Sequence, residues 1–236
     1  RQALALIFLL NPFLGVLSTL FFVFVSKEKS MAFYLVIILT LFMWCLQSTR
    51  SFHLGEPSDW AGNYYYNFHN AAITDTLTYL FFTTKEYAWQ AFNLIGYYLF
   101  DGDFLSYANF IVALTYMFTF AAIYKFWNYI QADPRFLVAS LCLFAFVTEV
   151  NGICNNLLRQ QFAMSMMLYA IIERCTNGRI LYPLLVISFF THTMTGFFIP
   201  FLFIRLGKKA SFRFYIYIVL GFGLLYILFT NLSIFS

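Results

Sequence analysis

The sequence predicts an all-α protein, a polytopic integral membrane helix bundle with an extracytoplasmic cap of amphipathic helices and a re-entrant helical hairpin near His192. Three observations lead to this prediction. Of the 236 residues, 62% are hydrophobic and 10% are charged, whereas about 25% of the residues of a soluble domain are charged. The 33 Phe and 17 Tyr suit contact with lipid tails and with membrane interfaces. The basic residues lie in short gaps between apolar runs, as cytoplasmic loops require.

The chain is expected to form a single transmembrane domain over residues 1–236, because no internal repeat and no low-complexity tract divides it. It starts at Arg1 and enters an apolar run at once, so we expect it to be part of a longer membrane protein. The net charge of +4 does not indicate a nucleic-acid partner, since no Lys/Arg cluster is interleaved with stacking aromatics. The four cysteines contain no CxxC pair and are expected to be core thiols.

Apolar runs of about 20 residues are long enough to cross a bilayer. The first two runs cover residues 3–25 and 31–46 and are joined by the short basic turn 26–30. The later runs cover residues 104–126, 136–147, 157–172, 180–204 and 214–229. This pattern predicts roughly six full spans together with one re-entrant hairpin.

Residues 47–103 are more polar than the rest of the chain. They hold six of the ten acidic residues and two of the three histidines, among many aromatic residues. We expect this segment to form the extracytoplasmic cap, made of short amphipathic helices that lie on the membrane surface. The best helix candidate is 86–100, in which Tyr87, Phe92, Leu94 and Ile95 allow an apolar face.

The positive charges set an orientation, because short cytoplasmic loops are enriched in Lys and Arg. Placing the turn 26–30 inside puts the cap outside, but a full span over 180–204 would then put the basic loop 205–213 outside as well. The conflict disappears if the chain turns back near His192. Each arm of about 12 residues then reaches about 18 Å, well short of the ~30 Å bilayer core. Non-helical backbone at that depth is tolerated where it lines a cavity, so His192 is expected to line one that opens outward. The alternative is an ordinary span with His192 as a packing residue.

Ionisable residues near membrane segments are costly and often functional. Arg159 starts the run 157–172, where a guanidinium at a helix N-terminus can bind a phosphate with two hydrogen bonds. The amides of Gln160 and Asn156 lie beside it, and Arg50 follows the second run at the outer surface. Two arginines at one cavity suit a pyrophosphate. The alternative for both arginines is a membrane-flanking charge in contact with lipid headgroups.

Three carboxylates on the outer side, those of Glu56, Asp59 and Glu86, are candidate general bases, and their spacing singles out none of them. The sequence has no DxD, HExxH, P-loop or GxSxG pattern and no metal-ligand spacing. We therefore expect no metal and no cofactor.

Arg159, Gln160 and Ala163, with His192 further along, resemble a pattern of the EpsG and Wzy families, which are integral membrane polymerases of bacterial surface polysaccharides. In these families a helix that starts with Arg-Gln is followed by a basic loop and by a helix that ends in a His-x-Ser/Thr element. The resemblance covers about residues 1–205. Further residues match an Arg, a Gly–Asp element, a Tyr and an E-x-x-[WF] element after the second span: Arg50, Gly55, Asp59, Tyr64, Glu86 and Trp89.

The resemblance implies glycosyl transfer on the periplasmic side of the bacterial inner membrane, in the synthesis of O antigen or exopolysaccharide. A glycan on one undecaprenyl pyrophosphate would move to the non-reducing-end sugar of another lipid-linked repeat unit. The implied partners are the undecaprenyl-pyrophosphate-linked oligosaccharide, the lipid bilayer and a chain-length regulator protein, with no nucleic acid. The implied roles fall to six residues: catalysis to His192, Asp59 and Glu86, and pyrophosphate binding to Arg159, Arg50 and Gln160.

Two roles remain open for His192. A neutral imidazole can accept the proton of the attacking sugar hydroxyl, and an imidazolium can donate a hydrogen bond to the departing phosphate. We prefer the base, because Arg159 and Arg50 already supply positive charge.

Three other functions compete with polymerisation. A transporter or flippase of the lipid-linked oligosaccharide, without catalysis, would be favoured by inverted repeats, and none is found in the sequence. A ligase or mannosyltransferase-like enzyme would use the same lipid donor but carry a larger outer domain or an early acidic pair. A structural membrane subunit is the third.

Overall fold

The computed structural model describes residues 2–26, 31–49, 60–146 and 157–203, and these residues form helices and turns without a strand. The all-α prediction is therefore confirmed for this part of the chain. The helices are α1 (Gln2–Leu10), α2 (Pro12–Ser26), α3 (Ala32–Ser48), η2 (Trp60–Tyr64), α4 (Tyr65–Ile73), α5 (Thr76–Phe82), α6 (Tyr87–Leu99), α7 (Phe104–Ile130), α8 (Pro134–Phe146), α10 (Leu158–Asn177), α11 (Tyr182–Thr191) and η3 (Thr193–Phe203).

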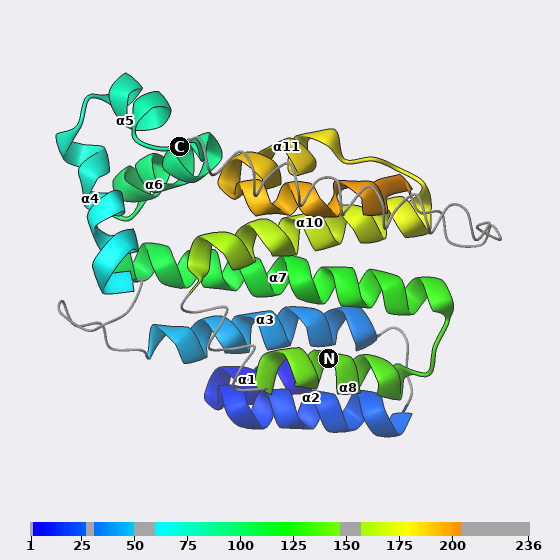
Figure 1. Ribbon diagram of the computed structural model, residues 1–236. Coiled ribbons are helices and arrows are strands. Elements are labelled where there is room, and N and C mark those ends of the chain that lie inside the picture. The colour runs from blue at the N-terminus through cyan, green and yellow to red at the C-terminus, as the bar shows by residue number, and fades with distance from the viewer. Residues whose placement is uncertain (1, 27–30, 50–59, 147–156, 204–236) are drawn as a thin grey trace.

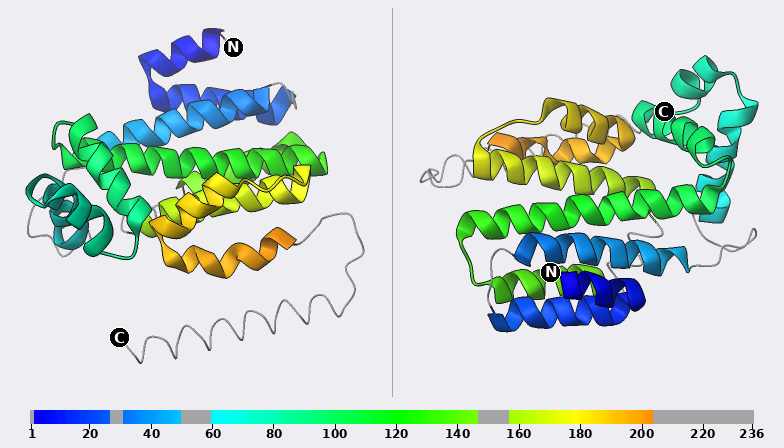
Figure 2. Two further views of the ribbon diagram at one scale, coloured as in Figure 1. Left: turned by 90° about the horizontal axis from the view of Figure 1, so that it is seen from above. Right: turned by 180° about the vertical axis from the view of Figure 1, so that it is seen from behind.

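Helix α7 runs through the middle of the molecule (Figure 1). It packs against α3 on one side and α10 on the other. Helices α1, α2 and α8 form a further layer beyond α3, while α11 and η3 cover α10. The short helices α4, α5 and α6 gather at the end of the bundle where α7 begins, as both views of Figure 2 also show.

Local chemistry sets both ends of α7. The Asp103 carboxylate caps the helix, with Oδ1 accepting from the backbone N–H of Leu105 at 3.0 Å. The Ser106 hydroxyl also donates to this carboxylate, and this hydrogen bond is the main cause that lowers the Asp103 pKa. At the other end Gln131 adopts a left-handed conformation with φ of 53°, which ends the helix.

One helix of the described residues, α7, is both long enough, at 27 residues, and apolar enough to cross a bilayer. Helix α10 has 20 residues but is less apolar. The other apolar helices of that part are shorter: α1 has nine residues, and the rest have between 10 and 17. The expected run 3–25 is not one span, because Asn11 and Pro12 divide it. Pro12 has no N–H and begins α2, and the Asn11 side chain caps that helix by accepting from Leu14 N at 3.1 Å. The run 214–229 lies outside the described residues.

The expected cap region contains separate short helices, so residues 76–100 do not form one straight helix. Helix α6 turns a largely polar face into the bundle. Its buried residues are Trp89, Gln90, Asn93 and Gly96, whereas Ile95 is 62% exposed. The polar amides face inward because they meet other polar groups there, and the exposed apolar side chains face away from the protein.

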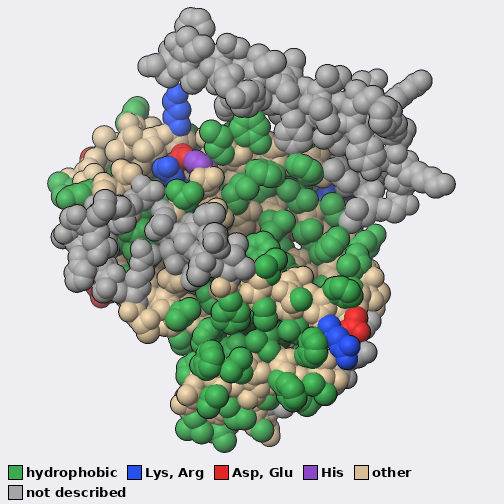
Figure 3. Space-filling view, turned by 60° about the horizontal axis from the view of Figure 1, so that its bottom comes forward, with side chains coloured by type: hydrophobic (Ala, Val, Ile, Leu, Met, Phe, Trp, Pro, Cys, Tyr) green, Lys and Arg blue, Asp and Glu red, His purple; other side chains and the backbone are tan. Residues whose placement is uncertain are grey.

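Large apolar side chains cover much of the molecular surface. Figure 3 shows hydrophobic side chains spread over one face, with charged side chains gathered in a few places. Leu9, Leu10, Phe21 and Phe136 are each more than two-thirds exposed. Exposed apolar surface on this scale suits contact with lipid tails and agrees with a membrane protein.

The cysteines are not the core thiols that the sequence indicated. Cys45 is exposed, and Cys142 and Cys175 are only partly buried. Cys142 packs from α8 against the edge of the hydrophobic core, and Cys175 lies near the end of α10. Cys154 lies outside the described residues.

Lys125 of α7 forms an ion pair with Glu173 of α10 at the end of these helices opposite the cap. The Asn177 amide donates a 2.9 Å hydrogen bond to the same carboxylate. Because Glu173 is buried, its charge requires such partners. The Lys125–Glu173 ion pair therefore links α7 to α10.

Gly96 allows α6 to lie directly against α7. A Cβ atom at this position would come within 2.3 Å of the Tyr107 ring, which is itself buried. The Tyr107 hydroxyl donates a 2.9 Å hydrogen bond to Asn93 Oδ1, and this bond ties the two helices together. The approach matters for the site, because α6 carries Glu86 at its start.

Gly96→Ala is therefore expected to destabilise the protein by about 1–3 kcal/mol, because the added methyl group overpacks this contact. Thermal unfolding in detergent micelles measures the effect. Gly62→Ala is the matched control, since a Cβ there meets nothing within 4 Å and alanine is the better helix former. If both variants melt like the parent, the close approach of α6 to α7 is wrong.

The chain reverses direction at His192. Helix α11 runs back along α10, and after His192 η3 returns beside it (Figures 1 and 2). Both arms pack on α10 and on each other. His192 interrupts the helix with an extended backbone, φ −156° and ψ 116°. The placement of this hairpin as re-entrant in a bilayer stays a prediction.

Candidate active site

A carboxylate held between an arginine and a histidine side chain forms the centre of the site. Glu86 Oε2 forms an ion pair with the Arg159 guanidinium, and Oε1 lies 2.6 Å from His192 Nδ1. The Glu86 side chain is 12% exposed and that of His192 15%. The three residues come from the start of α6, the start of α10 and the break after α11. The fold thus brings together groups far apart in the sequence.

Glu86 is positioned by the turn that leads into α6. Its backbone N–H donates to Thr84 Oγ1 at 3.2 Å, and its carbonyl accepts from Gln90 N at 3.2 Å. One turn later Trp89 is buried, with its ring 5.8 Å from the Tyr64 ring. Trp89 therefore anchors α6, and the Glu–x–x–Trp element places Glu86 at a rigid helix start.

His192 is held by hydrogen bonds through its backbone. Its N–H donates to the Ser188 carbonyl at 3.0 Å, and its carbonyl accepts from the Thr195 hydroxyl at 2.9 Å. Helix α11 is attached to α10 by the buried Ser188 hydroxyl, which donates to the Ala163 carbonyl at 2.8 Å. The small, fully buried Ala163 lets the two helices approach, so the alanine of the Arg-Gln pattern has a packing role.

Arg159 stands in the first turn of α10. Leu157 precedes this helix and has no side-chain oxygen to cap it, so the helix start favours a negative group. The Arg159 Nε atom is buried and has no hydrogen-bond partner within the described structure. The guanidinium thus pairs with Glu86, but its Nε–H has no hydrogen-bond acceptor within the described structure.

The contact with Glu86 defines the proton arrangement of His192. An ionised carboxylate only accepts hydrogen bonds. Nδ1 therefore carries the proton and donates a hydrogen bond to Glu86. In a neutral imidazole Nε2 is then unprotonated and can accept a proton. A carboxylate behind an imidazole also stabilises the imidazolium that forms when the proton arrives.

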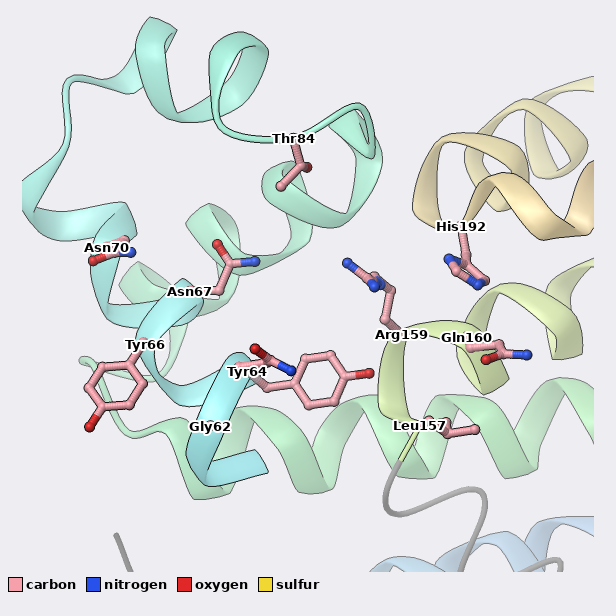
Figure 4. A pocket seen from close by; sticks show the side chains of 11 residues that line it. Gly62, Tyr64, Tyr66, Asn67, Asn70, Thr84, Leu157, Arg159, Gln160 and His192 are labelled. Atoms are coloured by element: carbon pink, nitrogen blue, oxygen red, sulfur yellow. The ribbon is translucent and has the colours of Figure 1, made fainter. Parts of the chain in front are cut away.

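Arg159 and His192 border a cavity of about 510 Å³, and Glu86 lies behind them. Arg159, Gln160 and His192 line one side of it, and residues of η2, α4 and the turn before α6 line the other (Figure 4). The cavity lies at the cap end of the bundle. The expectation that His192 faces the same cavity as Arg159 agrees with this arrangement.

The sequence-predicted residues fall into three groups. Glu86, Arg159 and His192 meet directly. Gln160 lines the same cavity, but its side chain extends away from the Arg159 guanidinium in Figure 4, so the two do not converge on one point. Arg50 and Asp59, together with Glu56 and Asn156, lie outside the described residues.

Several cavity residues escaped the sequence reasoning, among them Asn63, Asn67, Asn70 and Thr84. The three asparagines follow an i, i+4, i+7 pattern, which places them on one face of a helix. That spacing was a readable signal.

A family model described as the EpsG family matches residues 33–236, most of the chain. The match begins later and ends later than the resemblance expected over about residues 1–205. No curated protein and no solved structure matches the chain.

Proposed function

Because the chain belongs to the EpsG family, which supports a polysaccharide-polymerase-like function, we propose that it is a membrane glycosyltransferase acting on lipid-linked sugars. It transfers a glycan from undecaprenyl pyrophosphate to the non-reducing end of a second lipid-linked repeat unit. The observation that carries this proposal is that Arg159 and His192 line one cavity and that the Glu86 carboxylate behind them contacts both. It joins an anion-binding group and a proton acceptor in one site.

Arg159 binds the pyrophosphate of the donor. A guanidinium presents two parallel N–H donors to a phosphate, and the uncapped start of α10 adds favourable partial charge. When the pyrophosphate binds, it replaces Glu86 as the partner of some of the Arg159 N–H groups. Negative charge grows on the leaving pyrophosphate during transfer, and a fixed donor there lowers the barrier.

His192 accepts the proton of the acceptor hydroxyl at Nε2. The hydroxyl oxygen forms a bond to the anomeric carbon of the donor sugar as the bond from that carbon to the pyrophosphate oxygen breaks. The lipid pyrophosphate leaves with the electron pair. Glu86 holds the imidazole through Nδ1 and stabilises the imidazolium, so it is a positioning residue rather than the base.

The cap and the site are placed on the periplasmic side of the bacterial inner membrane in this proposal, with α7 as a span. The exposed apolar side chains of the cap helices, such as Phe82 at 81% and Ile95 at 62%, support contact with the membrane interface. The lipid tail of the substrate then approaches the cavity from the bilayer.

Cysteine labelling tests this orientation in a background where the four native cysteines are replaced by serine. Thr76→Cys in the cap is expected to react with a membrane-impermeant maleimide in intact spheroplasts. Asn128→Cys, exposed near the other end of α7, is expected to react only after lysis, because the reagent does not cross the bilayer. The reverse pattern would contradict the periplasmic site.

The proposed reaction is tested with purified protein in detergent and lipid-linked repeat units extracted from cells that lack this polymerase. A ladder of lengthened lipid-linked products is expected on a gel. Absence of a ladder, combined with transport of the same lipid across a reconstituted vesicle membrane, would assign the chain to the flippases instead.

A further inference from the structure

The cavity has two chemically different walls. One wall carries Arg159 and His192, backed by Glu86. The other carries uncharged amide and hydroxyl groups on η2, α4 and the turn before α6, namely Asn63, Asn67, Asn70 and Thr84. We refer to these four residues as the amide wall. The proposed reaction uses the charged wall and leaves the amide wall without a role.

Buried groups behind the amide wall hold it in place. Gln90 is fully buried, and its Nε2 donates to Asn67 Oδ1 at 3.4 Å and to Thr84 Oγ1 at 3.3 Å. The Tyr79 hydroxyl donates to the Asn67 carbonyl at 2.8 Å. Burial raises the Tyr79 pKa to about 12, so this hydroxyl stays protonated and remains a donor at neutral pH. Asn67 and Thr84 of the amide wall are thus pre-organised before any ligand arrives.

The amide wall is also connected to the charged wall. Thr84 Oγ1 accepts from the Glu86 backbone N–H at 3.2 Å as well as from Gln90. The same short turn therefore positions both the Thr84 hydroxyl of the amide wall and the Glu86 carboxylate that holds His192. A ligand seated on the amide wall lies across the cavity from Arg159 (Figure 4).

The chemistry of the amide wall indicates the class of ligand. Carboxamides donate and accept hydrogen bonds, which matches sugar hydroxyl groups that do both. Arg159, the positively charged side chain among the described cavity residues, lies on the opposite wall, so a phosphate has its partner there. An apolar tail gains nothing from a wall of amides, since their hydrogen bonds to water would be lost.

We propose that the amide wall is the acceptor subsite, which binds the uncharged terminal sugar of the receiving repeat unit and directs its hydroxyl toward His192. This inference rests on the proposed function and assigns separate walls to the two substrates. Asn67 and Asn70 bind the sugar, and Gln90 is a positioning residue that acts through Asn67 and Thr84.

Two probes separate the walls in binding experiments on the full chain in lipid nanodiscs. The first is the repeat-unit oligosaccharide freed of lipid and phosphate by mild acid, which carries only the acceptor chemistry. The second is undecaprenyl pyrophosphate without sugar, which carries only the donor's leaving group. Asn67→Ala and Asn70→Ala are expected to weaken the first probe by about fivefold for each hydrogen bond lost, and to leave the second within twofold.

Arg159→Ala is expected to show the opposite selectivity. Asn128→Ala, an exposed asparagine at the far end of α7, is the matched control and should bind both probes like the parent. Unchanged undecaprenyl pyrophosphate binding by Asn67→Ala also shows that this variant is folded; if it does not fold, Asn70→Ala gives the same test.

Parent-like oligosaccharide binding by both asparagine variants would overturn the acceptor subsite while leaving the polymerase proposal intact. If the parent binds undecaprenyl pyrophosphate but not the oligosaccharide, the acceptor subsite is likewise overturned and the polymerase proposal stays intact. Failure of the parent to bind either probe would overturn the proposed function itself.

Discussion

Arg159→Lys is expected to lower the polymerisation rate by about 100-fold or more, the range for loss of a donor to a developing negative charge. Lysine keeps the charge but has no planar pair of N–H donors for the pyrophosphate. It also fits poorly between Glu86 and the start of α10, where the guanidinium now lies. The rate of ladder formation with lipid-linked repeat units measures the effect.

Arg179→Lys is the matched control, because Arg179 is exposed beyond the other end of α10 and far from the cavity. It is expected to polymerise at the parent rate. A parent-like rate for Arg159→Lys would show that Arg159 is an interfacial anchor and that the pyrophosphate binds elsewhere.

His192→Gln is expected to lower the polymerisation rate by about 100- to 10,000-fold, as loss of a general base does. Glutamine can still donate a hydrogen bond but is a poor base, so His192→Gln and His192→Ala should be equally impaired. Undecaprenyl pyrophosphate binding should persist in both variants, because Arg159 is intact. Substantial activity in His192→Gln alone would instead assign His192 to the departing phosphate.

Glu86→Gln, combined with His192→Gln, tests whether the two residues act together, because the rate losses of coupled residues do not multiply. If Glu86 acts by holding His192 through Nδ1, the double variant His192→Gln/Glu86→Gln should be no slower than His192→Gln alone. Multiplied losses would instead show that Glu86 acts independently of His192, in keeping with its candidacy as a general base.

The turn near His192 followed from the placement of the basic loops, whereas composition and periodicity were enough to predict the helical class and the short helices between the second and third apolar runs. These features are local. An apolar run, a polar tip or a cluster of acidic residues restricts its own backbone whatever its neighbours are. Asn11–Pro12 was an equally local signal, and the division of the first run into α1 and α2 could have been read from it.

The same local reasoning selected Arg159 and His192, because ionisable groups beside apolar helices are costly unless they have partners. It could not rank Glu86 above the other carboxylates. The rank depends on which carboxylate lies at the meeting point of α6, α10 and α11, and that follows from contacts across the chain such as Ser188 to Ala163 and Gly96 to Tyr107.

Sequence alone therefore determined that this protein is a helical, apolar chain with a few costly polar groups at one end. The tertiary structure decided how those groups pair, that Gln160 turns away from Arg159 while Glu86 joins it, and that an amide wall faces them. The physical reason is the distance along the chain between the residues that interact. Helix formation depends on neighbours within a few positions, whereas an ion pair and a cavity depend on where whole helices pack.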